Sequence, residues 1–153
     1  MNGKKEAGLK QVLEKTIPSS LGDIIRERRN ELSVRLSTAE DFAELPPMVS
    51  MLDEQKQVKA TVNEWRIICL DQREDGKRRF MLTGIDAKTD QIWATSLVKS
   101  VDFKNHLVLT ANSLYRLGTK GEGEPTFHIL LHLCHIFHKW GFGARFGVPH
   151  VFY

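Results

Sequence analysis

Residues 62–85, VNEWRIICLDQREDGKRRFMLTGI, decide the fold of this chain. Two runs rich in apolar residues, Val62 to Leu70 and Arg79 to Ile85, flank a charged turn at residues 71–77 that contains a glycine. β-Branched and aromatic residues bounded by a turn of this kind are typical of paired β-strands. The stretch therefore predicts two antiparallel strands in the middle of the chain.

Further strands are expected on the C-terminal side of this pair. A turn at residues 86–90 leads into a long run of strand-forming residues from Ile92 to Phe103. Lys104-Asn105 then fits a tight turn into His106 to Thr110, and a last short strand covers residues 114–118. Successive strands joined by short turns favour an antiparallel meander of four or five strands, which can curl into a partial barrel.

The N-terminal part of the chain, residues 1–57, is predicted to be helical. Apolar side chains keep a helical period from Leu21 to Leu36, and two shorter helices can begin near Thr38 and Met48. We divide the chain into this helical segment and an α+β core at residues 58–153. The length is that of one typical domain, so the two parts are expected to form one compact unit.

The segment from Pro125 to Trp140 is predicted to be a C-terminal helix. Proline suits the first turn of a helix, and Gly141 suits its end. His128, His132 and His135 fall on one narrow face, and most of the remaining surface is apolar. An apolar face of this width implies that the helix packs on the sheet, which assigns the chain to the α+β class.

Composition and charge limit the class of protein. The 153 residues carry a formal net charge of +3, a weaker basic bias than a dedicated nucleic-acid-binding protein usually shows. No apolar run approaches the roughly 20 residues of a membrane helix, and the N-terminal residues show no signal peptide. Cys69 and Cys134 each lie in an apolar run and are expected to be buried thiols. We therefore expect a cytoplasmic protein without membrane contact.

Two sequence patterns stand out in the C-terminal half. Residues 93–98 hold a Thr-Ser-x-aliphatic strand, and residues 107–118 end in Thr-x-x-Ser-x-Tyr-x-Leu-Gly. Trp-Gly-x-Gly follows at residues 140–143, and Gly-Val-Pro at residues 147–149. This combination resembles short, uncharacterised bacterial proteins, some of them carried by phages and other mobile elements. The resemblance covers residues 62–153 and brings no established active site, but it implies an interaction protein of a mobile element directed at the host or its defences.

Signatures of catalysis are missing from the sequence. No serine stands in a Gly-x-Ser-x-Gly turn, and the glycines of residues 118–123 are not followed by Gly-Lys-Ser/Thr. The acids of residues 71–75 lie beside arginines in a turn, where nothing raises a carboxyl pKa for acid catalysis. We therefore predict a non-enzymatic protein that needs no cofactor.

The leading hypothesis is a protein-interaction module that occludes a surface of a larger protein or ribonucleoprotein. Such a module would act as an anti-defence (anti-CRISPR-like) inhibitor from a mobile element. Arginine and aromatic side chains are the residue types that interfaces favour. We expect the contacts to come from Arg26, Arg28, Arg29, Arg78, Arg79, Phe146, Phe152 and Tyr153.

Two other functions stay open. The same basic residues can pair with phosphates, as in a nucleic-acid-binding regulatory protein. His128 and His132 are four residues apart and His135 lies one turn further, so the three together can hold zinc. A solvent-facing stripe of polar residues on an otherwise buried helix is the simpler interpretation of the same pattern.

The three tryptophans, Trp65, Trp93 and Trp140, are expected in the core. If Trp93 instead faced outward beside Arg79, the two would form an aromatic and basic platform for single-stranded nucleic acid. The sequence alone does not decide between these placements.

Overall fold

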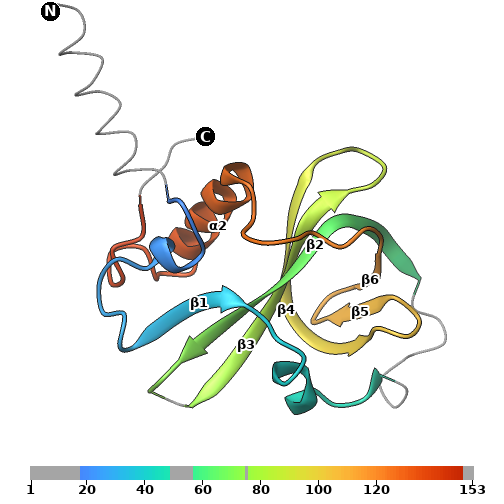
Figure 1. Ribbon diagram of the computed structural model, residues 1–153, viewed down its shortest axis with the longest axis horizontal. Helices are drawn as coiled ribbons and strands as arrows, with labels where there is room; N and C mark the ends of the chain where they lie inside the picture. Colours follow the sequence, from blue (N-terminus) through green and yellow to red (C-terminus); the bar gives the residue numbers. More distant parts are fainter. Residues whose placement is uncertain (1–17, 49–56, 75, 150–153) are drawn as a thin grey trace, which may run out of the picture.

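The computed structural model describes residues 18–48, 57–74 and 76–149, which form a six-stranded sheet with a helix packed on it (Figure 1). The strands follow the order of the chain, and each is antiparallel to the next. The predicted antiparallel meander is confirmed, with six strands instead of four or five. Their bounds are β1 (Leu32–Leu36), β2 (Val58–Gln72), β3 (Lys77–Asp86), β4 (Ile92–Asp102), β5 (Leu107–Thr110) and β6 (Leu114–Leu117).

The long strand β2 belongs to two parts of the fold. Its residues 58–62 pair in parallel with β6, whereas residues 68–72 pair with β1. The pairing with β6 brings β2 to β6 into a near-closed ring, the partial barrel expected from the sequence. Between the two parts lies a β-bulge at Asn63 to Arg66, with Glu64 at a φ of 49°. The bulge bends the strand, so that it leaves the ring and continues into an open sheet.

Gly84 on β3 permits a close approach to this bulge. A Cβ atom at this position would lie 2.6 Å from the carbonyl oxygen of Asn63 and would also overlap the side chain of Val62. Because one of these two contacts is with a backbone oxygen, which cannot rotate away, a larger residue at position 84 would have to shift the β2–β3 pairing.

Alternate side chains of β2 enter two different cores. Ile68 and Leu70 face the helix, whereas Ile67 and Cys69 point into the ring. Both faces of this part of the strand are covered, which explains why the run reads as apolar without alternation in the sequence. Ring residues that share the second core are Val62, Phe80, Leu82, Val98, Val108, Tyr115 and Leu117.

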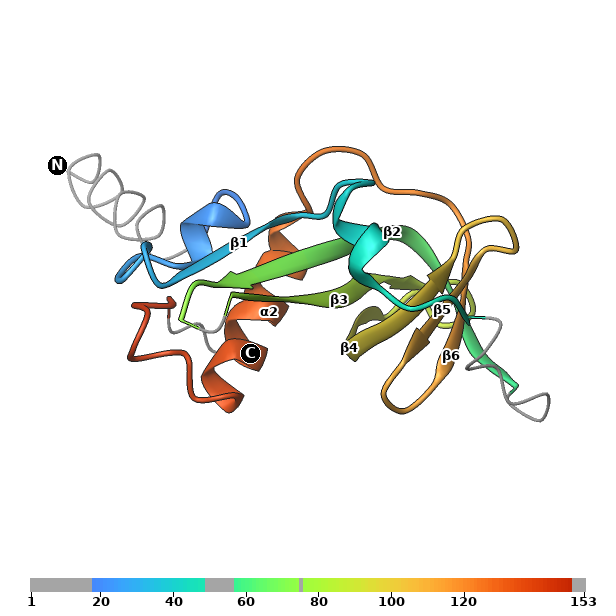
Figure 2. The ribbon, with the colours of Figure 1, turned by 90° about the horizontal axis from the view of Figure 1, so that it is seen from below.

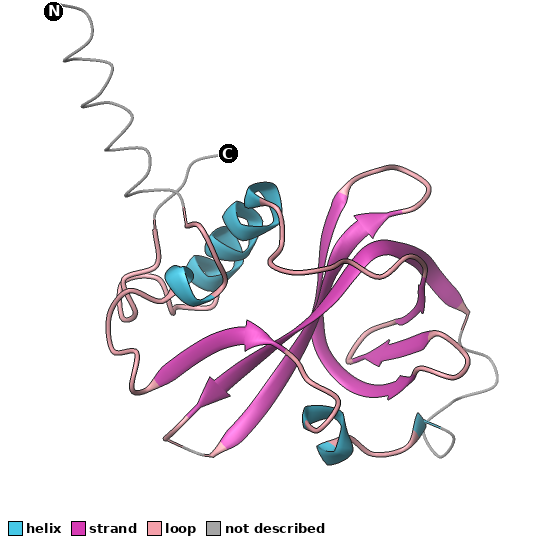
Figure 3. Ribbon diagram, in the orientation of Figure 1, coloured by secondary structure: helices cyan, strands magenta, loops and turns pink. Residues whose placement is uncertain are grey.

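Helix α2 (Phe127–Lys139) is the only α-helix among the described residues (Figure 3). Figure 2 shows it against the open part of the sheet, at the opposite end of the molecule from β5 and β6. Gly141, just after the helix, has a φ of 82°; a glycine in this left-handed conformation commonly ends an α-helix. The predicted C-terminal helix packed on the sheet is therefore confirmed. Its buried side chains are Ile129, Leu130, Leu133, Cys134 and Phe137.

The prediction of N-terminal helices is wrong where the structure describes that part of the chain. Residues expected to continue a helix to Leu36 form β1, in which Val34 lies opposite Leu70 of β2. Only short 3-10 turns are present between residues 18 and 48, at Gly22–Ile24 and at Asp41–Glu44. Leu32 and Val34 are buried on alternate positions, so pairing with β2 prevails over the helical spacing of the earlier residues. The helix expected from Met48 falls mostly on residues 49–56, outside the described residues.

The division at residues 57 and 58 stays a prediction, although β1 and β2 on its two sides are hydrogen-bonded to each other. None of the helices in the described ranges combines the length and the apolar character that a membrane span needs.

Candidate functional site

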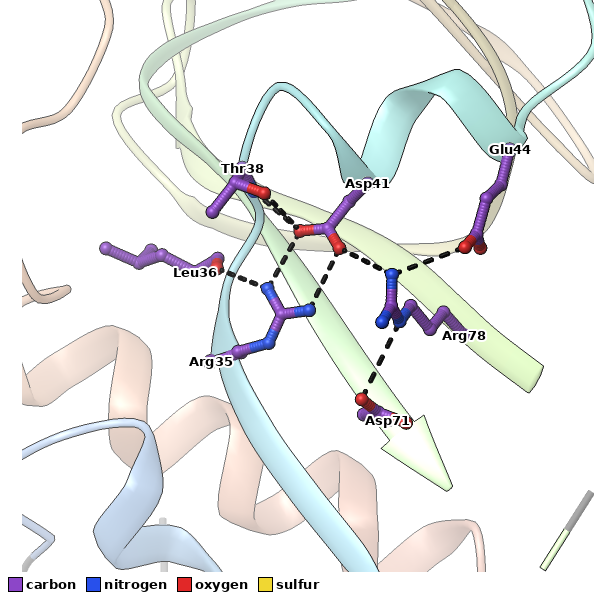
Figure 4. Close-up of polar contacts among 7 residues, drawn as sticks. All are labelled: Arg35, Leu36, Thr38, Asp41, Glu44, Asp71 and Arg78. Atoms are coloured by element: carbon purple, nitrogen blue, oxygen red, sulfur yellow. Dashed lines mark hydrogen bonds and ion pairs between the residues drawn. The ribbon is translucent and has the colours of Figure 1, made fainter. Parts of the chain in front are cut away.

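A buried carboxylate, Asp41, gathers two arginines from different strands (Figure 4). Its oxygens accept hydrogen bonds from Nη1 and Nη2 of Arg35 at 2.8 and 2.9 Å, and from the backbone N–H of Thr38 at 2.6 Å. Nη1 of Arg78 lies 3.3 Å from the same carboxylate. The hydrogen bonds from Arg35 hold the pKa of Asp41 well below its usual range, and the pKa of Arg35 is raised in turn. The cluster fastens the 3-10 turn that contains Asp41 to β1 and β3.

Arg78 thus lies among acids of its own chain. Its guanidinium also lies 3.2 Å from Glu44 and 3.7 Å from Asp71. Since three carboxylates surround one guanidinium, little positive potential reaches a partner molecule. The predicted contact role of Arg78 remains a prediction, and the geometry supplies a structural role instead.

The three N-terminal arginines lie in the segment before β1. Arg26 is 3.2 Å from Asp23, Arg28 is 3.7 Å from Glu31, and Arg29 is 4.0 Å from Asp23. These are local pairs on a solvated surface, each worth little in stability. The structure brings Arg26 and Arg29 together on one carboxylate, and it does not bring them near Arg78 or Arg79.

The aromatic C-terminal segment docks on its own domain. Phe146 has no exposed surface, and its carbonyl oxygen accepts hydrogen bonds from the backbone N–H groups of Arg26 and Glu27 at 2.9 Å. A buried ring cannot contact a partner, so Phe146 is removed from the predicted contact set. Phe152 and Tyr153 lie outside the described residues.

The histidine stripe faces outward along α2. His128 and His135 are exposed and His132 is half-buried, with its pKa lowered by burial and by the neighbouring His135 and Lys139 charges. Among residues 18–48, 57–74 and 76–149, no group of three or more His, Cys, Asp or Glu side chains is arranged to hold a metal ion. Zinc binding by His128, His132 and His135 therefore gains no support from the geometry. His138, on the flank of the stripe, hydrogen-bonds the carbonyl oxygen of Val148 at 3.0 Å.

A groove runs along the junction between the C-terminal end of α2 and the open sheet. We call it the seam groove; its volume is about 500 Å³. Trp140, which was expected in the core, stands at this groove with 41% of its surface exposed. Arg79 lies at its edge and donates a hydrogen bond to Gln72. The lining residues are Leu32, Leu70, Gln72, Arg79, Ser96, Leu97, Lys99, Ala111, Trp140 and Phe142.

A second hollow, which we call the ring pocket, lies beside the β-bulge of β2 and has a volume of about 790 Å³. It is enclosed by the turn after β1, by the β4–β5 hairpin and by the linker that joins β6 to α2. Trp65, Phe42 and Phe103 supply aromatic walls, and Arg66 and Lys120 supply positive charge. Sequence reasoning missed this pocket; the polar pair Asn63-Glu64 inside an apolar strand was the available sign of the bulge, beside which Trp65 lies partly buried and lines the pocket.

Comparison of the chain with protein-family models, curated proteins and solved structures gives no match.

Proposed function

We propose that this protein is a non-enzymatic interaction module that occludes a surface of a larger partner protein, and that the seam groove is its contact site. The observation that carries the proposal is the exposed indole of Trp140 beside an apolar groove. Tryptophan is among the residues that most often dominate binding energy at interfaces, and the Trp140 ring lines an apolar groove. The resemblance of residues 62–153 to proteins of mobile elements supports a cytoplasmic target in host defence.

The charges at the groove favour an acidic partner segment. Arg79 and Lys99 line it, and none of the described residues that line it carries a carboxylate. Ser96 also lines it, and its hydroxyl is buried without a hydrogen-bond partner among the described residues. An occupant with apolar side chains and a carboxylate would complement the apolar lining of the groove and its two cations.

Site-specific photo-crosslinking in a bacterial lysate tests this proposal. A photoreactive phenylalanine analogue at position 140 should capture one discrete protein whose recovery survives nuclease treatment. The matched control is the same analogue at Phe127, which lies on the same helix and is 50% exposed, but does not line the groove. Capture from position 127 as strong as from position 140 would contradict the groove as the contact site.

Affinity for the captured protein provides the quantitative test. Trp140→Ala should weaken binding by about tenfold or more, and Arg79→Glu should act chiefly through slower association. Arg28→Glu changes an exposed arginine outside the groove and should leave the affinity within about twofold. A partner that binds all three variants equally would refute the proposal.

A further inference from the structure

The ring pocket carries a second inference, independent of the seam groove. Its aromatic side chains form a continuous series: the rings of Phe42 and Phe103 are 4.9 Å apart edge to face, and those of Phe103 and Trp65 are stacked at 6.0 Å with an angle of 19°. Phe103 is 39% exposed, although it stands in a hairpin where a polar residue would cost nothing. Phe103 therefore presents part of its ring to solvent, next to the partly buried rings of Trp65 and Phe42.

Two cations complete the site. The Lys120 ammonium group lies 5.7 Å from the centre of the Trp65 ring, and Lys120 itself is exposed. The Arg66 side chain is 9% exposed and donates to the backbone carbonyl oxygens of Gly123, Glu122 and Glu64. None of the ion pairs found among the described residues includes Arg66 or Lys120.

Arg66 is thus a nearly buried residue whose guanidinium, among the described parts of the chain, donates to neutral carbonyl groups and to no carboxylate. It has five N–H donors, and three hydrogen bonds occupy three of them. Burying a charge without an opposite charge is costly, and an anion in the pocket would relieve that cost. Glu122 is the acidic side chain among the lining residues, so the pocket keeps a net positive charge.

We propose that the ring pocket binds an unpaired nucleotide of a single-stranded nucleic acid. A base stacks on the Trp65 ring, in place of the Lys120 ammonium group that now lies over the indole, and Phe103 supports the Trp65 ring through their own stacking contact. The displaced ammonium group and Arg66 then lie beside the phosphate that follows the base. Aromatic stacking together with cations that follow the backbone is the general way in which proteins hold single strands. The volume of about 790 Å³ lies in the range of pockets that take small organic ligands.

Fluorescence anisotropy with a labelled strand of about 12 nucleotides, as DNA and as RNA, tests the proposal on the full chain. The wild type should bind the single strand more tightly than a duplex of the same sequence. Trp65→Ala should weaken binding by about 10- to 100-fold, and Phe103→Ala should also weaken it. Lys120→Ala should reduce the slope of log affinity against log salt by about 0.7.

Trp93 offers a matched control, because Lys59 lies 5.6 Å from the centre of its ring in the same kind of contact outside the pocket. Trp93→Ala should retain wild-type binding. Trp65→Phe keeps an aromatic ring but, like Trp65→Ala, loses the hydrogen bond from the indole N–H to the carbonyl oxygen of Gly118. It should lose much less affinity than Trp65→Ala, which would show that the loss in the alanine variant does not come from a folding defect caused by the missing hydrogen bond. Circular dichroism of every variant checks that the fold is intact.

Five outcomes would overturn the proposal. The first is the absence of single-strand binding at low salt, and the second is an affinity for the duplex equal to that for the single strand. The third is an equal loss of affinity in the Trp65→Ala and Trp93→Ala variants. The fourth is binding of an acidic peptide at this pocket without binding of the oligonucleotide. A mononucleotide that bound as tightly as the strand would also remove the assignment to nucleic acid.

Discussion

Arg35 and Asp41 form a two-pronged ion pair in which both guanidinium Nη atoms lie within 2.9 Å of the carboxylate. Asp41 is 2% exposed, while the side chain of Arg35 is 37% exposed. The side chain of Asp41 is therefore enclosed, whereas the side chain of Arg35 reaches solvent. Because the backbone of Thr38 also donates to Asp41, the pair fixes the entrance to the turn after β1, which is one wall of the ring pocket.

Replacing Asp41 by asparagine should destabilise the protein by about 2–4 kcal/mol, because Arg35 would lose its counter-charge. Urea unfolding followed by circular dichroism measures the change. Glu44→Gln serves as the control, since Glu44 is 54% exposed and should change the stability by less than about 0.5 kcal/mol. Equal effects of the two substitutions would show that burial of the Arg35–Asp41 pair contributes nothing.

The Arg35–Asp41 pair makes the free energy of unfolding depend on pH in the acidic range. The pKa of Asp41 is lower in the folded protein than its ordinary value of 3.8, so its contribution is complete above about pH 4. That contribution is lost progressively as the pH falls below this value towards the folded pKa. Unfolding free energies measured from pH 6 downwards, a range of about three units, should fall more steeply for the wild type than for Asp41→Asn. Parallel curves would contradict this assignment.

Gly84→Ala should destabilise the protein by about 1–3 kcal/mol, because the new methyl group meets Val62 and the carbonyl group of Asn63. Gly22→Ala is a fair comparison, since the nearest atom to a Cβ at that position is 3.9 Å away. Thermal melting of both variants distinguishes them. A Gly84 variant as stable as the Gly22 variant would show that β2 and β3 can separate at the bulge without cost.

Phe146→Ala should cost about 3–5 kcal/mol of folding stability, because its ring fills the core beneath α2. Phe127→Ala should cost less than about 0.5 kcal/mol, since that ring is half exposed. Chemical unfolding of the purified variants gives both values. Loss of partner binding by a Phe146 variant with unchanged stability would restore the contact role predicted from the sequence.

Cys69 and Cys134 should resist alkylation in the folded protein. Burial raises the pKa of each thiol to about 11, so the thiolate that reacts is scarce near pH 8. Titration with a thiol reagent should find both groups unreactive in buffer and both reactive in urea. Rapid reaction of either thiol without denaturant would mean that its core opens readily.

Local sequence was enough to predict the strands from β2 to β6 and the helix α2, because each is bounded by its own turn residues. The strand β1 was missed since its residues also continue a helical spacing that begins at Leu21, and only the neighbouring β2 decides between the two. Helix patterns of this kind are outweighed when a strand partner is available.

The ring pocket could not be predicted from spacing. Trp65, Phe103 and Lys120 come from a strand, a hairpin and a linker that lie far apart in the chain, and the ring brings them together. The sequence predicts contact roles for the arginine runs because the charge of a side chain follows from the residue type alone. The pairs of Arg26 with Asp23 and of Arg28 with Glu31 join residues three apart, whereas the pairing of Arg78 with Asp41 is visible only in three dimensions.

The parallel pairing of β2 with β6 has a consequence for how the chain folds. The pairs β2–β3, β3–β4, β4–β5 and β5–β6 each join strands connected by a short turn, and such hairpins can close within microseconds. Joining residues 58–62 to residues 114–117 instead brings together segments separated by the whole meander. Ring closure therefore pays the largest entropic cost of loop closure among these pairings. During synthesis, the ring cannot close until Leu117 has left the ribosome. We therefore expect ring closure to be the slow step of folding, and the ring pocket to exist only after it.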